Sequence, residues 1–315
     1  MIKLLDIKKD RSVYETLCQK QKATVFNSLD WLELYGKHLK LYGIFNNNNE
    51  LTGSFFLFYT TKKTFKLHLT PPFSANNGLF FENRSANNAN IQTTVKHNLE
   101  EVAAFCEKLG SQLFVFVLPV NINDAQPFIW KKFKVKVKYT YHINLELPVE
   151  TLLANLSSEK RKSLNKAQKD DLQIQEAKDM KLVKQLILKT FSRKQMSKNL
   201  NYLDKILLEY AAPKNSIAYV ASENGNPIAS TFCVYDSTTA YYLFGGYDAG
   251  QRNHGAGVTC MWNSILKAKE LGLKTFDFEG SMLPEVEKYF REFGGTLTPY
   301  YEVSKAKFPL TLYYK

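Results

Sequence analysis

Hydrophobic and polar positions follow the same order in two stretches of the chain that lie about 160 residues apart. In each stretch an amphipathic helical pattern, at residues 99–110 and 261–272, leads into a short strand pattern. The segment "KLGSQLFVF" at 108–116 corresponds to "ELGLKTFDF" at 270–278, an offset of 162 residues. A loop, a second helix and an aromatic closing strand follow in both stretches. The pattern therefore predicts a tandem duplication of one α/β domain.

The remaining parts of both halves read as strands separated by polar turns. Residues 42–70 alternate strands with turns, and the Asn run 46–49 is typical of a hairpin loop. Residues 216–248 contain three strand-like runs. Helices are predicted at 150–156 and 158–170, the second capped by Ser157 or Ser158.

These patterns predict a mixed α/β fold made of two tandem domains, each a mixed β-sheet flanked by helices. Pro148 ends the closing strand of the first copy, so the domains are expected to span residues 1–148 and 149–315.

The segment "KTFDFEGSM" at 274–282 differs from its counterpart in the first copy in one informative way. Read as a strand, it places Phe276 and Phe278 on one face and Asp277 and Glu279 on the other. A strand in a βαβ unit is buried on both faces, where carboxylates are unusual. The first copy has valines at the positions of the two acids. The second domain is therefore expected to carry the chemistry.

Composition indicates a folded globular protein, with 44% hydrophobic and 14% aromatic residues. No run approaches 18 uninterrupted apolar residues, so no transmembrane helix is expected. The first residues lack an apolar signal core, which favours a cytoplasmic protein. The four cysteines are far apart, and buried thiols are favoured over disulfides or metal ligands.

The formal net charge is +12, and much of the excess lies in residues 151–200, which carry 12 basic and 5 acidic side chains. Such a segment has two interpretations. It is either the solvated face of a Lys-rich helix or a surface for a polyanion or a phosphorylated ligand.

The most specific motif lies in residues 244–257, where R-x-x-G-x-G precedes a helix with a coherent apolar stripe. A glycine-rich turn that enters a helix presents unpaired backbone N–H groups and the positive end of the helix dipole. Together these groups bind pyrophosphate. The alternative is a tight turn that needs glycine only for its backbone conformation.

The order strand, R-x-x-G-x-G, helix, strand, helix resembles the acyl-CoA-binding core of GNAT-type N-acetyltransferases. The whole layout is similar to the Fem-type peptidoglycan aminoacyltransferases, which are built from two GNAT-like domains. Residues 159–174, 243–257 and 276–305 carry this second resemblance. It implies an N-acyltransferase that acts on an amine of an amino sugar, an amino acid or a cell-envelope precursor, without a metal.

The resemblance also assigns the donor site to the second domain, because the first copy has no glycine before its helix. It implies that acetyl-CoA or another acyl-CoA is held by Gly246, Tyr247, Arg252, Asn253, Gly255, Ala256 and Gly257.

Two catalytic positions depart from the family patterns. The lysine that Fem-type enzymes use corresponds to Arg291, which keeps the cation but cannot give up its proton. The tyrosine that often protonates the departing thiolate in GNAT enzymes corresponds to Phe290, with Tyr289 alongside.

The resemblance implies a cleft between the strand at about 240–247 and the strand at 275–279, with Asp277 and Glu279 in or beside it. A carboxylate there could remove the proton from an attacking ammonium group, directly or through water. Either acid could instead cap a loop or pair with Lys288 or Arg291. The five histidines lack metal-ligand spacing, and no G-x-S-x-G motif indicates a serine hydrolase.

Two further hypotheses remain open. In the first, the donor is an aminoacyl-tRNA, which Lys160, Arg161, Lys162 and Lys166 would contact through its phosphates. In the second, the protein is a non-catalytic binding module on the same fold.

Overall fold

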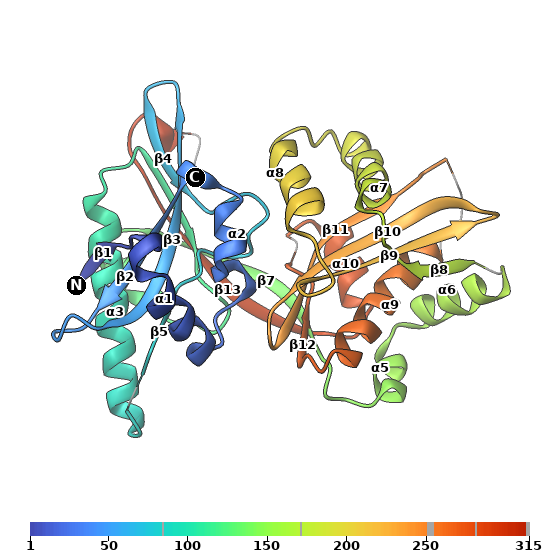
Figure 1. Ribbon diagram of the computed structural model, residues 1–315, viewed down its shortest axis with the longest axis horizontal. Coiled ribbons are helices and arrows are strands. Elements are labelled where there is room, and N and C mark those ends of the chain that lie inside the picture. Colours follow the sequence, from blue (N-terminus) through green and yellow to red (C-terminus); the bar gives the residue numbers. More distant parts are fainter. Residues whose placement is uncertain (84, 171, 251–254, 281, 313–315) are drawn as a thin grey trace. The chain divides into compact units, whose positions relative to one another are not determined.

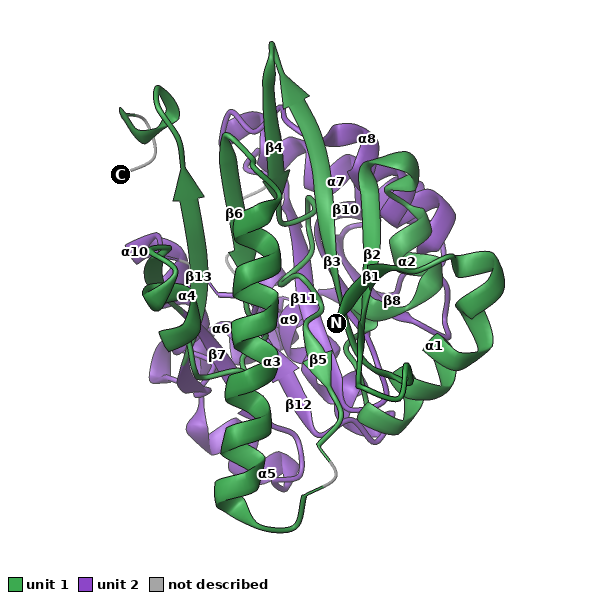
Figure 2. Ribbon diagram, turned by 90° about the vertical axis from the view of Figure 1, so that its left-hand side faces the viewer, with its two compact units in different colours: residues 1–138, 299–315 green, residues 139–298 purple. Residues whose placement is uncertain are grey.

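The computed structural model describes residues 1–83, 85–170, 172–250, 255–280 and 282–312. The chain forms two compact units, residues 1–138 with 299–315 and residues 139–298 (Figure 2). Each unit has a mixed β-sheet with flanking helices, so the predicted fold class is confirmed. The predicted domains, 1–148 and 149–315, concern the copies of the sequence repeat and stay a prediction.

The first unit contains the N-terminal elements (Figure 1). Its helices and strands are β1 (Ile2–Leu4), α1 (Ile7–Gln21), α2 (Leu29–Glu33), β2 (Leu39–Phe45), β3 (Leu51–Lys62), β4 (Phe65–Leu69), β5 (Phe80–Phe81), α3 (Asn88–Lys108), β6 (Leu113–Val117) and α4 (Gln126–Trp130). The sheet order is β1-β2-β3-β4-β6, with β5 on β3, and the predicted Asn hairpin joins β2 to β3. The apolar stripe of α3 packs on this sheet through Leu99, Val102 and Ala103, which are fully buried.

The second unit contains the elements that carry the R-x-x-G-x-G motif. They are α5 (Val149–Asn155), α6 (Ser158–Lys169), β8 (Gln173–Glu176), α7 (Met180–Arg193), α8 (Leu200–Lys205), the π-helix Ile206–Tyr210, β9 (Ser216–Glu223), β10 (Asn226–Tyr235), β11 (Thr239–Tyr247), α9 (Ala256–Glu270), β12 (Thr275–Asp277) and α10 (Pro284–Arg291). The three predicted strands at 216–248 are confirmed as β9, β10 and β11. Ser157 is the cap of α6, since its Oγ accepts a hydrogen bond from the Lys160 N–H at 3.2 Å.

The closing strands of the two sequence copies, β7 (Lys134–Asn144) and β13 (Thr296–Ala306), are exchanged. In β7, His142–Asn144 pair antiparallel with β12 in the second unit. In β13, Glu302–Ala306 pair antiparallel with β6 in the first unit. Each sheet therefore includes a strand that closes the other copy of the repeat.

Strand β12 is short and central, and the two faces around it differ. Phe276 and Phe278 are buried against helix α10, where the Phe278 and Phe290 rings stack at 4.9 Å between centroids. Asp277 is also buried but points to the other face. The strand is thus buried on both faces, as predicted. It ends at Asp277, so Glu279 lies beyond it rather than within it.

Strands β11 and β12 run parallel only over their first residues. Their register pairs Thr239 with Thr275 and ends with Tyr241 opposite Asp277, while β11 continues to Tyr247. The two strands therefore part immediately after Asp277. This places the carboxylate at the point where the sheet opens.

Candidate functional site

The predicted phosphate-binding turn joins β11 to α9. Arg252 and Asn253 lie outside the described residues, whereas Gly255 is the N-cap of α9 and Ala256 and Gly257 form its first turn. Because Gly255 has no side chain, it cannot cap the N–H groups of this turn. The assignment of this turn as a pyrophosphate site stays a prediction.

Gly257 and Gly246 serve different purposes. A Cβ added to Gly257 would meet, among the described residues, Tyr289 Oη alone within 4 Å, at 3.8 Å. A Cβ at Gly246 would lie 2.6 Å from the carbonyl carbon of Leu186 and 2.7 Å from the Ile187 nitrogen. Packing against the α7 backbone thus explains the glycine at 246. The described neighbours of Gly257 give no comparable reason for a glycine there.

Asp277 lies in a row of polar side chains that crosses three strands. Tyr241 of β11 is opposite it on one side and His142 of β7 on the other. The Thr140 hydroxyl donates to Asp277 Oδ1 at 2.5 Å, and the Glu279 backbone N–H donates to the same oxygen at 2.8 Å. Both donors fix the orientation of the carboxylate.

His142 faces the second oxygen of Asp277. Its Nε2 lies 3.1 Å from Asp277 Oδ2 and is buried, without hydrogen-bond geometry to any group in the described part of the chain. The contact is therefore one of charge proximity rather than a hydrogen bond. The His142 side chain is 22% exposed and that of Asp277 only 7%, so the imidazole is the more accessible of the two.

Glu279 is strained and poorly solvated. Its φ of 60° is in the left-handed region, which residues other than glycine rarely adopt. Its Oε1 is buried and has no hydrogen-bond partner within the described residues. Burial raises the pKa of Glu279 well above its ordinary value, and the charge of Asp277 raises it further. Glu279 is therefore suited to hold a proton.

Glu279→Gln is expected to make the stability of the protein less dependent on pH. The native wild type retains a proton on Glu279 that the unfolded chain releases near 4.5. Its free energy of unfolding therefore decreases as the pH rises from there toward the raised pKa of Glu279, a cost that glutamine avoids. Urea denaturation at a series of pH values between about 4 and about 8 measures this difference. The exposed Glu285 gives a matched control in Glu285→Gln, and parallel curves for wild type and Glu279→Gln would contradict the expectation.

Tyr289 connects the start of α9 with helix α6. Its hydroxyl is near Gly257, and the Lys160 ammonium lies 3.7 Å from the centroid of its ring. Burial raises the pKa of Tyr289, so the phenol stays protonated at neutral pH. Phe290 is buried in the core, which leaves Tyr289 as the α10 hydroxyl on this side.

Lys160 and Arg291 occupy opposite environments. Lys160 is 5% exposed and lies 3.3 Å from Glu292, and burial lowers its pKa. Arg291 has a side chain that is 60% exposed and pairs with Glu287 at 3.1 Å. A buried lysine thus stands beside Tyr289, whereas the predicted arginine forms a surface ion pair.

The other basic residues predicted on α6 divide into two kinds. Arg161 donates to the carbonyl oxygens of Ala154 and Leu156, which ties the helix to the end of α5. Lys162 and Lys166 are exposed. Of the four predicted tRNA contacts, these two present their charge to solvent.

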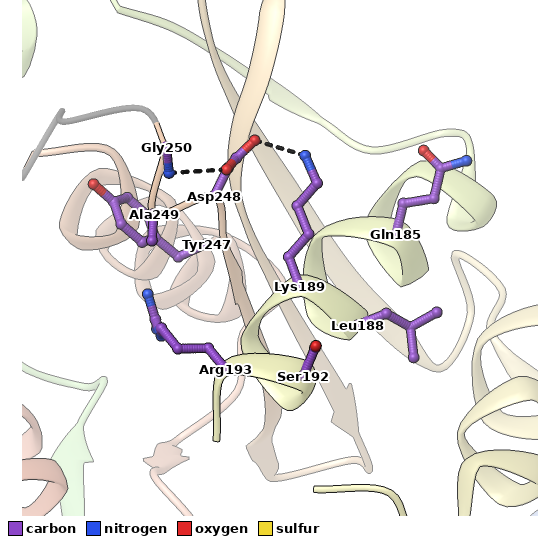
Figure 3. Close-up of a pocket in the computed structure, with 9 residues that line it drawn as sticks. All are labelled: Gln185, Leu188, Lys189, Ser192, Arg193, Tyr247, Asp248, Ala249 and Gly250. Atoms are coloured by element: carbon purple, nitrogen blue, oxygen red, sulfur yellow. Dashed lines mark hydrogen bonds and ion pairs between the residues drawn. The ribbon is translucent and has the colours of Figure 1, made fainter. Parts of the chain in front are cut away.

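A hollow of about 710 Å³ opens at the end of β11 (Figure 3). Its lining comes from α7 and from the end of β11 with the residues after it: Gln185, Leu188, Lys189, Ser192, Arg193, Tyr247, Asp248, Ala249 and Gly250. The Tyr247 N–H donates to Thr190 Oγ1 at 2.9 Å, which fixes α7 against the end of β11. Tyr247, a predicted donor contact, thus lies at the wall of a hollow.

His142, Thr140 and the α7 cations were not predicted as site residues. The two β7 residues belong to the closing strand of the first copy, and no local pattern shows that this strand pairs with β12. Polar residues on the same face of β7 as His142 were the one available signal. Among the described side chains, no group of three His, Cys, Asp or Glu residues could hold a metal ion. Within the same residues, no helix combines the length and hydropathy of a membrane span.

Comparison with known proteins gives one family and several similar folds. Residues 159–291 match the family model "Acetyltransferase (GNAT) domain". No curated protein matches the sequence. The crystal structure of FemX is similar over 96% of both chains, with a TM-score of 0.67 and 11% identity.

Two further solved structures match over most of the chain. L-PGS from Bacillus licheniformis has a TM-score of 0.59 and 11% identity, over 96% of this chain and 94% of the other. A tandem GNAT protein from the clavulanic acid biosynthesis pathway has a TM-score of 0.53 and 10% identity, over 97% and 98%. At these identities the similarity concerns the fold.

Proposed function

We propose an N-acyltransferase function for this protein, on the premise that residues 159–291 form a GNAT acetyltransferase domain in a chain with the tandem fold of the Fem-like proteins. The predicted resemblance to that superfamily is thereby confirmed. The observation that carries the proposal is the parting of β11 and β12 at Tyr241 and Asp277. A ligand bound at the start of α9 can extend along β11 to an acid at the end of this gap.

The proposed donor is acetyl-CoA or another acyl-CoA. Its pyrophosphate would bind the N–H groups of Gly255, Ala256 and Gly257, together with Arg252 and Asn253, while Gly246 and Tyr247 would line its path. The open space at Gly257 supports this assignment, because a side chain there would occupy the volume that a phosphate needs.

The proposed reaction is the attack of an amine nitrogen on the thioester carbonyl carbon. Before the attack the ammonium passes one proton to His142, which lies beside Asp277. The neutral amine then forms the C–N bond, and the C–S bond breaks as Tyr289 gives its proton to the departing thiolate. The second proton on the new amide nitrogen returns to Tyr289, directly or through water. Glu279, held protonated, would donate a hydrogen bond to the acceptor, and Arg291 has at most an electrostatic role.

The proposed acceptor is an amine on an amino sugar, an amino acid or a cell-envelope precursor. Placing the amine and the thioester together could contribute about 7–11 kcal/mol, which exceeds what a general base usually supplies. The identity of the acceptor is therefore expected to depend on binding contacts more than on the acid–base groups.

Acetyl-CoA is expected to raise the melting temperature of the purified protein in a concentration-dependent way, because it binds the native state alone. The same protein should release CoA thiol from acetyl-CoA when a panel of amino sugars and amino acids is supplied. A melting temperature that no acyl-CoA changes would contradict the proposal. A shift without thiol release from any amine would favour the non-catalytic binding module.

One observation supports an aminoacyl-tRNA donor as a second candidate. Lys162 and Lys166 are exposed on the same helix, where they could contact the phosphates of a tRNA. Under this alternative, Lys162→Gln with Lys166→Gln should weaken a salt-sensitive tRNA complex. Lys160→Gln and Arg161→Gln should act instead through stability, because these side chains have partners within the protein.

A further inference from the structure

The hollow at the end of β11 contains two cations, Lys189 and Arg193, and one carboxylate, Asp248. Lys189 Nζ lies 2.6 Å from Asp248 Oδ2, and the same carboxylate accepts the Gly250 N–H at 3.1 Å (Figure 3). The hydrogen bond from Lys189 has the largest effect in lowering the pKa of Asp248, and the hydrogen bond from the Gly250 N–H lowers it further. Asp248 therefore pairs with Lys189, one of the two cations, and with the Gly250 N–H.

Arg193 is the second cation, and it is available. Its guanidinium carbon lies 5.9 Å from the centroid of the Tyr247 ring, and the described part of the chain holds no carboxylate in ion-pair contact with it. Figure 3 shows its side chain beside Tyr247 and Ala249, on the wall where β11 ends. A planar guanidinium suits bidentate binding of a phosphate group better than an ammonium does.

The position of the hollow connects it with the donor site. Its lining ends at Gly250, five residues before Gly255 at the start of α9. Five residues of chain span at most about 18 Å, so the hollow lies within that distance of the helix start where the pyrophosphate would bind. In CoA the groups next to the pyrophosphate are a ribose with a third phosphate, a monoester on the 3′ oxygen.

We propose that the hollow binds the 3′-phosphate of the CoA donor, with Arg193 as its main contact and Tyr247 as the wall beside the ribose. The inference rests on the proposed function and adds a selectivity to it. The enzyme should distinguish CoA from 3′-dephospho-CoA, which has the same thiol, pantetheine and pyrophosphate. A phosphorylated acceptor has the same charge chemistry, and the experiment separates the two sources.

The test compares the dissociation constants of CoA and 3′-dephospho-CoA by titration calorimetry. Wild type is expected to bind CoA about tenfold more tightly, as a charge-assisted contact to one phosphate implies. Arg193→Gln should bring the ratio close to one by weakening CoA alone. Lys194→Gln removes the same charge one residue further on, outside the hollow, and should leave the ratio unchanged.

A second measurement uses wild type alone, so that the proposal can be tested even if Arg193→Gln does not fold. Adenosine 3′,5′-bisphosphate should compete with CoA about tenfold better than AMP, which lacks the 3′-phosphate. Equal binding of CoA and 3′-dephospho-CoA to wild type overturns this inference and leaves the acyltransferase proposal intact, as does a ratio that Arg193→Gln does not change. If neither ligand binds, the acyl-CoA donor itself is wrong. If wild type binds CoA and 3′-dephospho-CoA equally, and the KM of a phosphorylated amine acceptor rises in Arg193→Gln, the hollow binds the acceptor instead.

Discussion

Asp277→Asn is expected to lower the rate of acyl transfer by about 100-fold or more, the contribution of a positioned acid–base group. Asparagine keeps an oxygen for the Thr140 hydroxyl and the Glu279 N–H, so the local structure should persist. It loses the negative charge 3.1 Å from His142 Nε2. The rate of thiol release with the best amine acceptor measures the effect.

Measurements of acetyl-CoA binding and of the pH–rate profile distinguish a role of Asp277 in proton transfer from a role in folding. Asp277→Asn should bind acetyl-CoA as wild type does, and the acidic limb of its pH–rate profile should change. His142→Gln should give a loss of similar size, and the double variant should be no worse than either single one, because the two groups act as a pair. Glu287→Gln is the matched control, since that acid accepts the Tyr141 hydroxyl at 2.6 Å but lies outside the row. Near-normal turnover of Asp277→Asn would leave the acid with a structural role.

Gly257→Val is expected to abolish acyl-CoA binding, by about 100-fold or more, without loss of fold. Among the described residues outside its own helix, Tyr289 Oη alone lies within 4 Å of an added Cβ, at an ordinary contact distance of 3.8 Å. The new methyl groups would occupy the space in front of the α9 N–H groups, where the pyrophosphate must approach. Titration calorimetry with acetyl-CoA measures the affinity, and urea denaturation measures the stability.

Gly246→Ala should give the opposite result and serves as the comparison. Its Cβ would overlap the α7 backbone at Leu186 and Ile187, so the protein should lose about 1–3 kcal/mol of stability. Gly257→Ala should instead keep or gain stability, because alanine favours a helix by about 0.5–1 kcal/mol over glycine. A Gly257→Val protein that binds acetyl-CoA normally would exclude the turn as the pyrophosphate site.

Much of the fold could be predicted from sequence because the element types depend on local periodicity. The helices α5 and α6 and the strands β9 to β11 lie where the patterns place them, whereas α3 and α9 overlap their predicted ranges but begin earlier, at Asn88 and Ala256. The partners of β7 and β13 could not be predicted in this way. Alternation along a strand shows which residues share a face but not which other strand provides the hydrogen bonds.

The candidate site could also be predicted only in part from the sequence. Two acids at strand positions that the first copy fills with valine carried the site prediction, which stays a prediction, and the structure buries Asp277 at the parting of two strands. The periodicity extended the strand too far, since β12 ends at Asp277 and Glu279 adopts a left-handed conformation. His142 and Thr140 reach the site through the strand exchange, which a search within one copy could not reveal.

The exchange of β7 and β13 also constrains how the two copies can change over time. A chain cut after residue 148 would leave β6 in one piece without β13 and β12 in the other piece without β7, each with an open row of backbone donors and acceptors. Each half of the chain therefore depends on the other for one strand of its sheet. A substitution in β7 or β13 acts on the copy that the strand joins as well as on the copy that encodes it, and the half without the turn supplies the strand with His142.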